Sequence, residues 1–283
     1  MSLAQYTIVK QLAPAIYGRV LLCVDKASHS TVAVKCMSTQ AASKRRSIKG
    51  NHAVHEDVAM EKKVMRKLSV GHHPYILNLV TDFHEDGQDH LVLEYCAQGE
   101  LFDLVCNCPA GRLTLDKTQE YFHQIASAVM FMHSQGVAHG DLSLENVLVN
   151  SQGECKLCDF GLAADLHSVR VDAVGKFFYM APEMYLKKAF APGPADVWSL
   201  GIMLFIMLTG TPLFKKANMD DATFSYFEEN GLRCMLSWWN MEQLFPEDVL
   251  EMLERMLEIN PTKRLTMKEL MASKFLQQRP CMG

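Results

Sequence analysis

Short runs of alternating apolar and polar residues fill the first third of the chain and predict strands. Residues 17–24 and 31–37 are rich in β-branched side chains, and a polar turn at 25–30 separates them. Asp86-Gly87 indicates a further hairpin, which leads into an apolar run at 90–95. We therefore expect a small antiparallel sheet in this part of the chain.

One stretch in the same region has helical rather than alternating periodicity. Over about residues 53–68, Val58, Met65 and Leu68 fall near one face, and Glu61 lies on the same side. We therefore expect a single helix between the second and third of these strand regions.

After about residue 95 the periodicity becomes helical. One repeat starts near Thr114 and consists of Phe122, Ile125, Val129 and Met132. Another follows Pro246 and consists of Val249, Leu253, Met256 and Leu257. Residues 194–209 are apolar on all sides, which predicts a buried central helix.

This change from strand-like to helical periodicity predicts two lobes within one unit over residues 1–283. A sheet-rich lobe covers about 1–95, a connector about 94–99, and a mainly helical lobe about 100–278. The fold class is α+β, with a small antiparallel sheet and one helix in the first lobe. The length of 283 residues, with 49% apolar and 21% charged residues, is typical of one large folded unit.

Charge and cysteine usage narrow the expected partners. The net charge of -4 gives no global basic field that would attract nucleic acid. The longest apolar run, at 200–208, is too short to span a bilayer, and residues 1–4 resemble no signal peptide. Nine cysteines, an odd number, disfavour an obligate disulfide framework. We expect a monomeric, cytoplasmic protein with no nucleic-acid or membrane partner.

Four short motifs occur in a fixed order. Val32-Ala33-Val34-Lys35 lies on a predicted strand, and His139-Gly140-Asp141 is followed five residues later by Asn146. Asp159-Phe160-Gly161 and Ala181-Pro182-Glu183 complete the set. Each motif alone is a weak signal, but their order and spacing together resemble the signature set of protein kinases.

The resemblance extends over about residues 6–276 and implies the bilobal protein-kinase fold, with ATP and Mg²⁺ as cofactors and proteins as substrates. Phosphoryl transfer depends on positioning and charge neutralisation. The resemblance implies that Lys35, braced by Glu61, holds the α- and β-phosphates. It also implies that Asn146 and Asp159 bind magnesium through hard oxygen atoms.

The resemblance also assigns the base and the nucleotide pocket. Asp141 would orient the attacking hydroxyl and accept its proton. Leu93 stands at the gatekeeper position, and the backbones of Glu94 and Cys96 would bind the adenine. The implied nucleotide-binding set is Leu12, Ala13, Ala15, Gly18, Val20, Ala33, Lys35, Leu93, Glu94, Cys96, Glu100, Leu148 and Asp159.

The glycine-rich loop of the family is degraded in this chain. Its pattern falls on Ala13, Ala15, Gly18 and Val20, so two glycines have become alanines, and Pro14 lies between them. Alanine disfavours the open backbone angles that glycine allows. We expect a stiffer loop with poorer amide contacts to phosphate.

Two further positions depart from the family together. Ser143 stands where Ser/Thr kinases carry a lysine that contacts the γ-phosphate. Lys176 stands where they carry a threonine that bonds both that lysine and the catalytic aspartate. We interpret the two as an exchange that returns an ammonium to Asp141, at about 2.7–2.9 Å for a charge-assisted bond. The alternative is coincidental drift of the two positions.

The segment between Asp159 and Gly175, called here the activation segment, lacks the usual sites of phosphate control. Gly140 replaces the arginine that binds a phosphate on this segment in many kinases, and Asp172 occupies the usual phosphothreonine position. Ser168 is the only hydroxyl within residues 162–174. We expect activity without phosphorylation of this segment.

The leading interpretation is an active Ser/Thr protein kinase, similar in texture to the calcium/calmodulin-dependent and AMP-activated groups. The alternative is a pseudokinase that binds nucleotide as a scaffold. Retention of the base and both magnesium ligands argues against that alternative. Glu100 and Glu145 match acidic positions that meet a basic residue upstream of the target in related kinases, although Glu100 has an alternative role on the ATP ribose.

Overall fold

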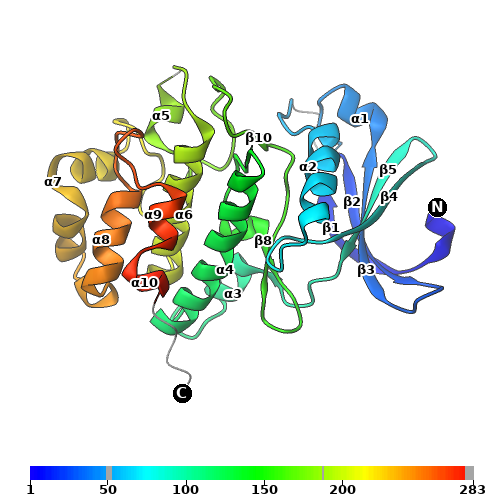
Figure 1. The fold of residues 1–283 in the computed structure, drawn as a ribbon, viewed down its shortest axis with the longest axis horizontal. Helices are drawn as coiled ribbons and strands as arrows, with labels where there is room; N and C mark the ends of the chain where they lie inside the picture. The colour runs from blue at the N-terminus through cyan, green and yellow to red at the C-terminus, as the bar shows by residue number, and fades with distance from the viewer. Residues whose placement is uncertain (49–52, 187, 278–283) are drawn as a thin grey trace.

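The computed structural model describes residues 1–48, 53–186 and 188–277 and shows two lobes (Figure 1). Strands dominate the lobe at the N-terminal end, and helices dominate the other, so the α+β fold class is confirmed. The predicted ends of the helical lobe at 278 and of the whole unit at 283 lie outside the described residues.

The smaller lobe contains one five-stranded antiparallel sheet in the order β1-β2-β3-β5-β4. Its strands are β1 (Tyr6–Ala15), β2 (Gly18–Asp25), β3 (Thr31–Ser38), β4 (Leu79–Glu85) and β5 (Gln88–Glu94). Three of them match the predicted runs. The sequence pattern did not single out β1, because this edge strand leaves apolar residues such as Ile8 and Val9 exposed.

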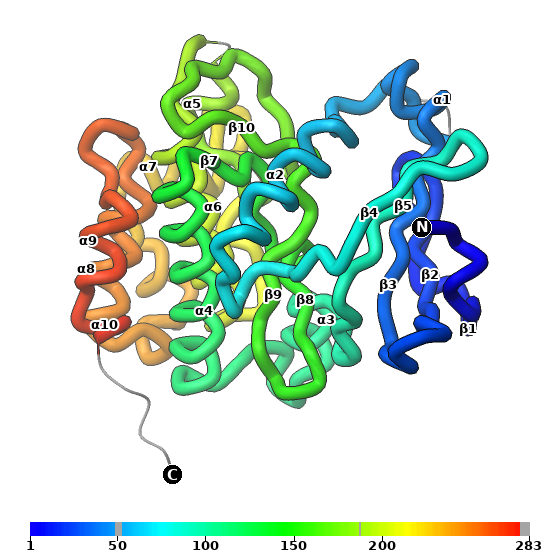
Figure 2. Tube along the Cα trace, turned by 45° about the vertical axis from the view of Figure 1, so that its right-hand side comes forward, coloured from blue at the N-terminus to red at the C-terminus, as the bar shows by residue number. Residues whose placement is uncertain are grey.

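A helix, α2 (Val58–Gly71), lies between the sheet and the larger lobe (Figure 2). The Asp57 side chain caps it by accepting hydrogen bonds from the amides of Ala59 and Met60. The helix therefore begins five residues later than the periodicity suggested. A short helix, α1 (Thr39–Ser43), follows β3, and a 3-10 turn, η1 (Leu3–Gln5), precedes β1.

The larger lobe is mainly helical, as predicted. Its helices are α3 (Leu101–Cys106), α4 (Leu115–Ser134), α5 (Pro182–Tyr185), α6 (Pro192–Thr209), α7 (Ala222–Trp238), α8 (Glu247–Met256), α9 (Met267–Met271) and α10 (Lys274–Gln277). Its shorter elements are β6 (Gly99–Glu100), β7 (Val137–Ala138), η2 (Leu144–Asn146), β8 (Val147–Val149), β9 (Cys155–Leu157), β10 (Ala164–Asp165) and η3 (Glu242–Leu244).

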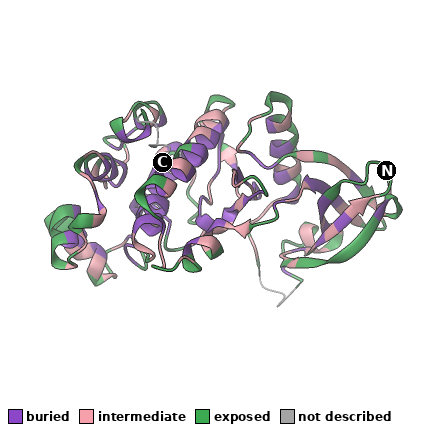
Figure 3. Ribbon diagram, turned by 90° about the horizontal axis from the view of Figure 1, so that it is seen from below, coloured by how far each residue is buried: buried purple, intermediate pink, exposed green. Residues whose placement is uncertain are grey.

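The central helix α6 is buried on all sides. Among the described residues it is the one helix with the length and apolar composition to cross a membrane, but 89% of it is buried inside the protein. This burial identifies it as the core helix that the sequence predicted. Buried residues concentrate in the middle of the larger lobe, whereas outer strands of the sheet are exposed (Figure 3).

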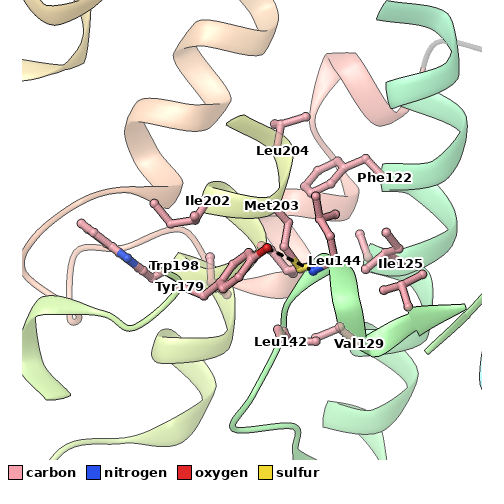
Figure 4. Packing of buried hydrophobic residues seen from close by; sticks show 14 of the residues in the cluster. Phe122, Ile125, Val129, Leu142, Leu144, Tyr179, Trp198, Ile202, Met203 and Leu204 are labelled. Carbon is pink, nitrogen blue, oxygen red and sulfur yellow. Dashed lines mark hydrogen bonds between the residues drawn. The ribbon is translucent and has the colours of Figure 1, made fainter. Parts of the chain in front are cut away.

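The loop that carries the candidate catalytic residues is anchored in this core. Leu142 and Leu144, on that loop, pack among side chains from α4 and α6: Leu142 lies beside Val129, and Leu144 lies near Met203 (Figure 4). Leu144 is completely buried and Leu142 is 1% exposed. Two apolar anchors therefore fix the backbone on either side of Ser143.

Candidate active site

A cleft of about 570 Å³ lies between the two lobes. It is lined by twelve of the thirteen residues expected to hold nucleotide: Leu12, Ala13, Ala15, Val20, Ala33, Lys35, Leu93, Glu94, Cys96, Glu100, Leu148 and Asp159. Gly18 is not among its lining residues. A Cβ at Gly18 would collide with the carbonyl oxygen of Cys36 on β3, so close strand approach requires this glycine.

Lys35 on β3 forms ion pairs with Glu61 on α2 and with Asp159 in the larger lobe. The Nζ of Lys35 lies 2.6 Å from Oε1 of Glu61 and 3.8 Å from Oδ1 of Asp159. Burial alone would lower the pKa of Lys35, but the two carboxylates outweigh it and raise that pKa. The ammonium is therefore held charged at the inner end of the cleft.

Asp141 and Asn146 form a compact pair on the loop below. The Nδ2 of Asn146 donates to the carbonyl oxygen of Asp141 at 2.7 Å and to its Oδ2 at 2.8 Å. The Oδ1 of Asn146 accepts a hydrogen bond from Nζ of Lys176 at 3.2 Å, and both Asn146 and Asp159 line the cleft. The Lys35 charge lowers the pKa of Asp159, which favours a carboxylate there.

These oxygen atoms suit a hard divalent cation. Mg²⁺ is usually held by one or two protein groups together with waters and substrate phosphates. Among the described residues, no group of three or more His, Cys, Asp or Glu side chains could hold a metal alone. Asn146 and Asp159 would supply two oxygen ligands to such a shared site, which phosphates and waters would complete.

Asp196 on α6 fixes the backbone before the catalytic aspartate. Its carboxylate accepts from the amides of His139 and Gly140 at 2.8 and 3.0 Å, and from Nε2 of His133 at 2.8 Å. Burial alone would raise the pKa of Asp196, but these hydrogen bonds keep it below the usual value.

Lys176 directly follows the activation segment. Its side chain reaches the loop that carries Asp141, Ser143 and Asn146, called here the catalytic loop. Its Nζ donates to Oγ of Ser143 at 2.8 Å and to Oδ1 of Asn146 at 3.2 Å, and lies 3.6 Å from Oδ2 of Asp141. The short bond is therefore to Ser143, not to Asp141 as expected. The Lys176 amide donates to Oδ1 of Asp141 at 3.2 Å, so the backbone and the side chain of Lys176 approach the two oxygen atoms of the same carboxylate.

Tyr17 and Glu56 were not recognised in the sequence. The hydroxyl of Tyr17, at the tip of the degraded glycine loop, donates to the carbonyl oxygen of Glu56 at 2.7 Å. Both residues line the cleft. Burial, and then the Asp159 charge, raise the pKa of Glu56 to about 7. A tyrosine and a glutamate 39 positions apart carry no sequence signal for this contact.

Three carboxylates, Glu100, Asp103 and Glu145, line the edge of the cleft. Burial raises the pKa of Glu100, and the charges of Asp103 and Glu145 raise it further. Glu145 also accepts a hydrogen bond from the hydroxyl of Tyr179, at 2.9 Å. The sequence interpretation named Glu100 and Glu145 but not Asp103.

A second ion pair fixes the larger lobe behind the site. Two nitrogen atoms of Arg264 contact the two carboxylate oxygens of Glu183 at 2.7 and 2.9 Å, and both residues are buried. The bidentate geometry is the strong form of such a pair. It fixes α5, which begins shortly after Lys176, to the core of the larger lobe.

Comparisons with known proteins agree with this geometry. The family model described as "Protein kinase domain" matches residues 6–276. The chain is 30% identical to CBL-interacting serine/threonine-protein kinase 18 of Arabidopsis thaliana over 282 residues, which is 98% of this chain and 50% of that protein. It is also 30% identical to CBL-interacting protein kinase 30 of Oryza sativa subsp. japonica, covering 99% and 56% respectively. The chain thus spans about half the length of these curated relatives.

Proposed function

The chain belongs to the protein kinase family, and we propose that it transfers the γ-phosphoryl group of ATP to Ser or Thr hydroxyls of protein substrates. The observation that carries the proposal is the combination of three groups around one cleft: the Lys35–Glu61 ion pair, the Asp141–Asn146 pair and the Asp159 carboxylate. The names of the similar proteins support the choice of Ser and Thr.

In this proposal each group has one task. Lys35 binds the α- and β-phosphates, and Glu61 keeps its ammonium in place. Asp141 orients the substrate hydroxyl and accepts its proton as the new bond to phosphorus forms. Magnesium, held by Asn146 and Asp159, would neutralise phosphate charge.

Lys176 takes the electrostatic role that the family gives to a lysine at position 143. Its ammonium lies beside Asp141, Ser143 and Asn146, where the γ-phosphate and the attacking hydroxyl have to meet. A cation aimed at developing negative charge in such a site is worth roughly 2.7–4 kcal/mol. Ser143 is fully buried and holds the ammonium through its hydroxyl.

A nucleotide-binding scaffold without catalysis is the alternative. Ala13 and Ala15 in the glycine-rich loop favour it, because they weaken amide contacts to phosphate. Against it stands the cost of holding several charges in one partly buried site. A scaffold has no need of Asp141, both metal ligands and a relocated lysine at once.

We also propose a preference for a basic residue upstream of the target hydroxyl. Glu100, Asp103 and Glu145 all line the cleft, and burial, followed by the charges of Asp103 and Glu145, raises the pKa of Glu100. Such a cluster gains from a nearby cation. Tyr179 already binds Glu145, so Glu100 and Asp103 are the freer partners.

The experiment is magnesium-dependent ATP turnover on a degenerate Ser/Thr peptide library, with Asp141→Asn as the control. We expect phosphorylated peptides enriched in Arg or Lys before the target, and loss of transfer in the control. Equal, slow transfer by both proteins would establish the scaffold alternative instead.

A further inference from the structure

Gly140 leaves a space beside the catalytic loop, and Arg170 of the activation segment fills it. The φ of Gly140 is +77°, a conformation that favours glycine. A Cβ there would lie 2.5 Å from the carbonyl oxygen of Leu162 and 3.0 Å from Nη1 of Arg170. The chain therefore carries no arginine at position 140, but a guanidinium from another segment stands next to it.

Arg170 links the start of its own segment with two other parts of the chain. Its Nη1 donates to the carbonyl oxygen of Leu162 at 2.9 Å, directly after Asp159-Phe160-Gly161. Its backbone pairs with Phe190, just before α6, through hydrogen bonds of 2.9 and 2.8 Å. With Gly140, Asp141, Lys176 and Asp196 it lines one small cavity.

Burial of the Arg170 guanidinium destabilises its charged form. Arg170 is partly buried, and burial lowers its pKa, while the charges of Asp172 and Asp196 oppose that effect. In the described part of the chain no carboxylate lies within ion-pair distance of it. A partly buried cation without a paired anion is unfavourable unless its other contacts compensate.

We propose that Arg170 is a positioning residue that ties the start of the activation segment to its later part, against Gly140 of the catalytic loop. The inference rests on the proposed kinase activity. In kinases with an arginine before the catalytic aspartate, a phosphate on the segment meets that arginine. Here the cation belongs to the segment and binds the backbone carbonyl of Leu162, so a phosphate is not needed.

The position of Lys176 depends on this fastening. A Cβ at Gly175 would lie 3.0 Å from Oδ1 of Asp141, so the end of the segment is packed tightly on the catalytic aspartate. The Lys176 amide donates to that same oxygen. A segment released at Arg170 would shift both Lys176 and Asp159. Displacements of about 1 Å in such sites can cost about a hundredfold in rate.

The test uses the full chain with Arg170→Met, which keeps the aliphatic stem but removes the donors, and with Arg170→Lys, which restores a cationic donor. Arg255→Ala is the control, because it removes one charge at an exposed site that pairs with Glu269. We expect Arg170→Met to lower kcat by about 10- to 100-fold with a smaller change in KM for ATP, and Arg170→Lys to recover most of the rate.

A second measurement does not require catalysis. Hydrogen–deuterium exchange of residues 159–175, without nucleotide, should rise in Arg170→Met and stay unchanged in Arg255→Ala. Wild-type kcat or unchanged exchange in a folded Arg170→Met protein would overturn the proposal. If Arg170→Met shows no cooperative unfolding on heating, the protein is not folded and Arg170→Lys becomes the deciding variant. Near-wild-type kcat and exchange in Arg170→Lys support the proposal. A full loss of kcat in Arg170→Lys overturns it. A wild-type chain that transfers no phosphate would refute the kinase activity, while exchange still tests Arg170.

Discussion

Lys176 and Ser143 share a hydrogen bond of 2.8 Å from Nζ to Oγ, across 33 positions of sequence. Ser143 lies between the buried anchors Leu142 and Leu144, and Lys176 lies at the end of the activation segment. Ser/Thr kinases usually carry a lysine at the position of Ser143 and a threonine at the position of Lys176. The ammonium and the hydroxyl have therefore changed places in this chain. Their contact is what an exchange of the two groups requires, and coincidental drift gives no reason for it.

Replacement of Lys176 by alanine should remove the ammonium beside Asp141 and leave the fold intact. Because its side chain is 36% exposed, we expect little change in thermal unfolding. Turnover should fall by about two to three orders of magnitude. Steady-state kinetics with Lys263→Ala, at an exposed site far from the cleft, provides the matched control. Equal rates in the two variants would contradict a catalytic role for Lys176.

Substitutions at Lys35 and Glu61 should have strongly coupled effects on the free energy of unfolding. Lys35→Met leaves the Glu61 carboxylate, 5% exposed, without its partner, which costs about 3–5 kcal/mol in comparable buried pairs. Lys35→Met with Glu61→Gln removes both charges and should be more stable than Lys35→Met alone. Urea unfolding measures the difference. A double variant that is less stable than the single one would show that the pair is not the source of the effect.

Glu56 should make the stability of the nucleotide-free chain depend on pH. Its pKa is about 7 in the folded protein and 4.5 ordinarily, so folding favours the protonated form. The penalty is absent below about pH 4.5, grows as the pH rises, and is complete above about pH 7. Glu56→Gln should therefore be more stable than wild type at pH 8 by about 1–3 kcal/mol, with allowance for solvent screening. The difference should vanish near pH 4.5. A difference independent of pH would contradict this assignment.

Activity should not depend on phosphorylation of the activation segment. Arg170 donates to the Leu162 carbonyl, and Asp172 places no hydroxyl at the usual phosphothreonine position. Protein made in bacteria and treated with phosphatase should keep its rate, and Ser168→Ala should change kcat less than twofold. Mass spectrometry confirms the absence of phosphate. A large loss after either treatment would show that a modified residue is required.

Much of the fold was predictable from the sequence because its patterns are local. The repeat from Thr114 gave α4, and the all-apolar stretch gave α6. The exposed edge strand β1 lacked a buried face, and α7 contains Gly231 with a φ of 78°, which divides it into two helical pieces. Neither element therefore shows one continuous periodicity.

The candidate site likewise contains residues that the sequence located and contacts that it did not show. Lys35, Asp141 and Asp159 stand in motifs, so the family pattern locates them. The contact of Tyr17 with Glu56 and that of Arg170 with Leu162 depend on how distant segments fold together. No local pattern encodes such contacts. The Lys176 ammonium does pair with Asp141, at 3.6 Å, which is longer than the charge-assisted bond that the sequence interpretation expected.

The most direct test of the exchange is a double-mutant cycle on Ser143 and Lys176, measured as kcat/KM for Mg-ATP-dependent peptide phosphorylation. Ser143→Lys places two ammonium groups beside Asp141, and Lys176→Thr leaves none, so each single variant should lose activity. The double variant restores the usual arrangement of Ser/Thr kinases. It should recover activity well beyond the product of the two single effects. Strictly multiplicative losses would contradict the account, because they would mean that the two residues do not act as a unit.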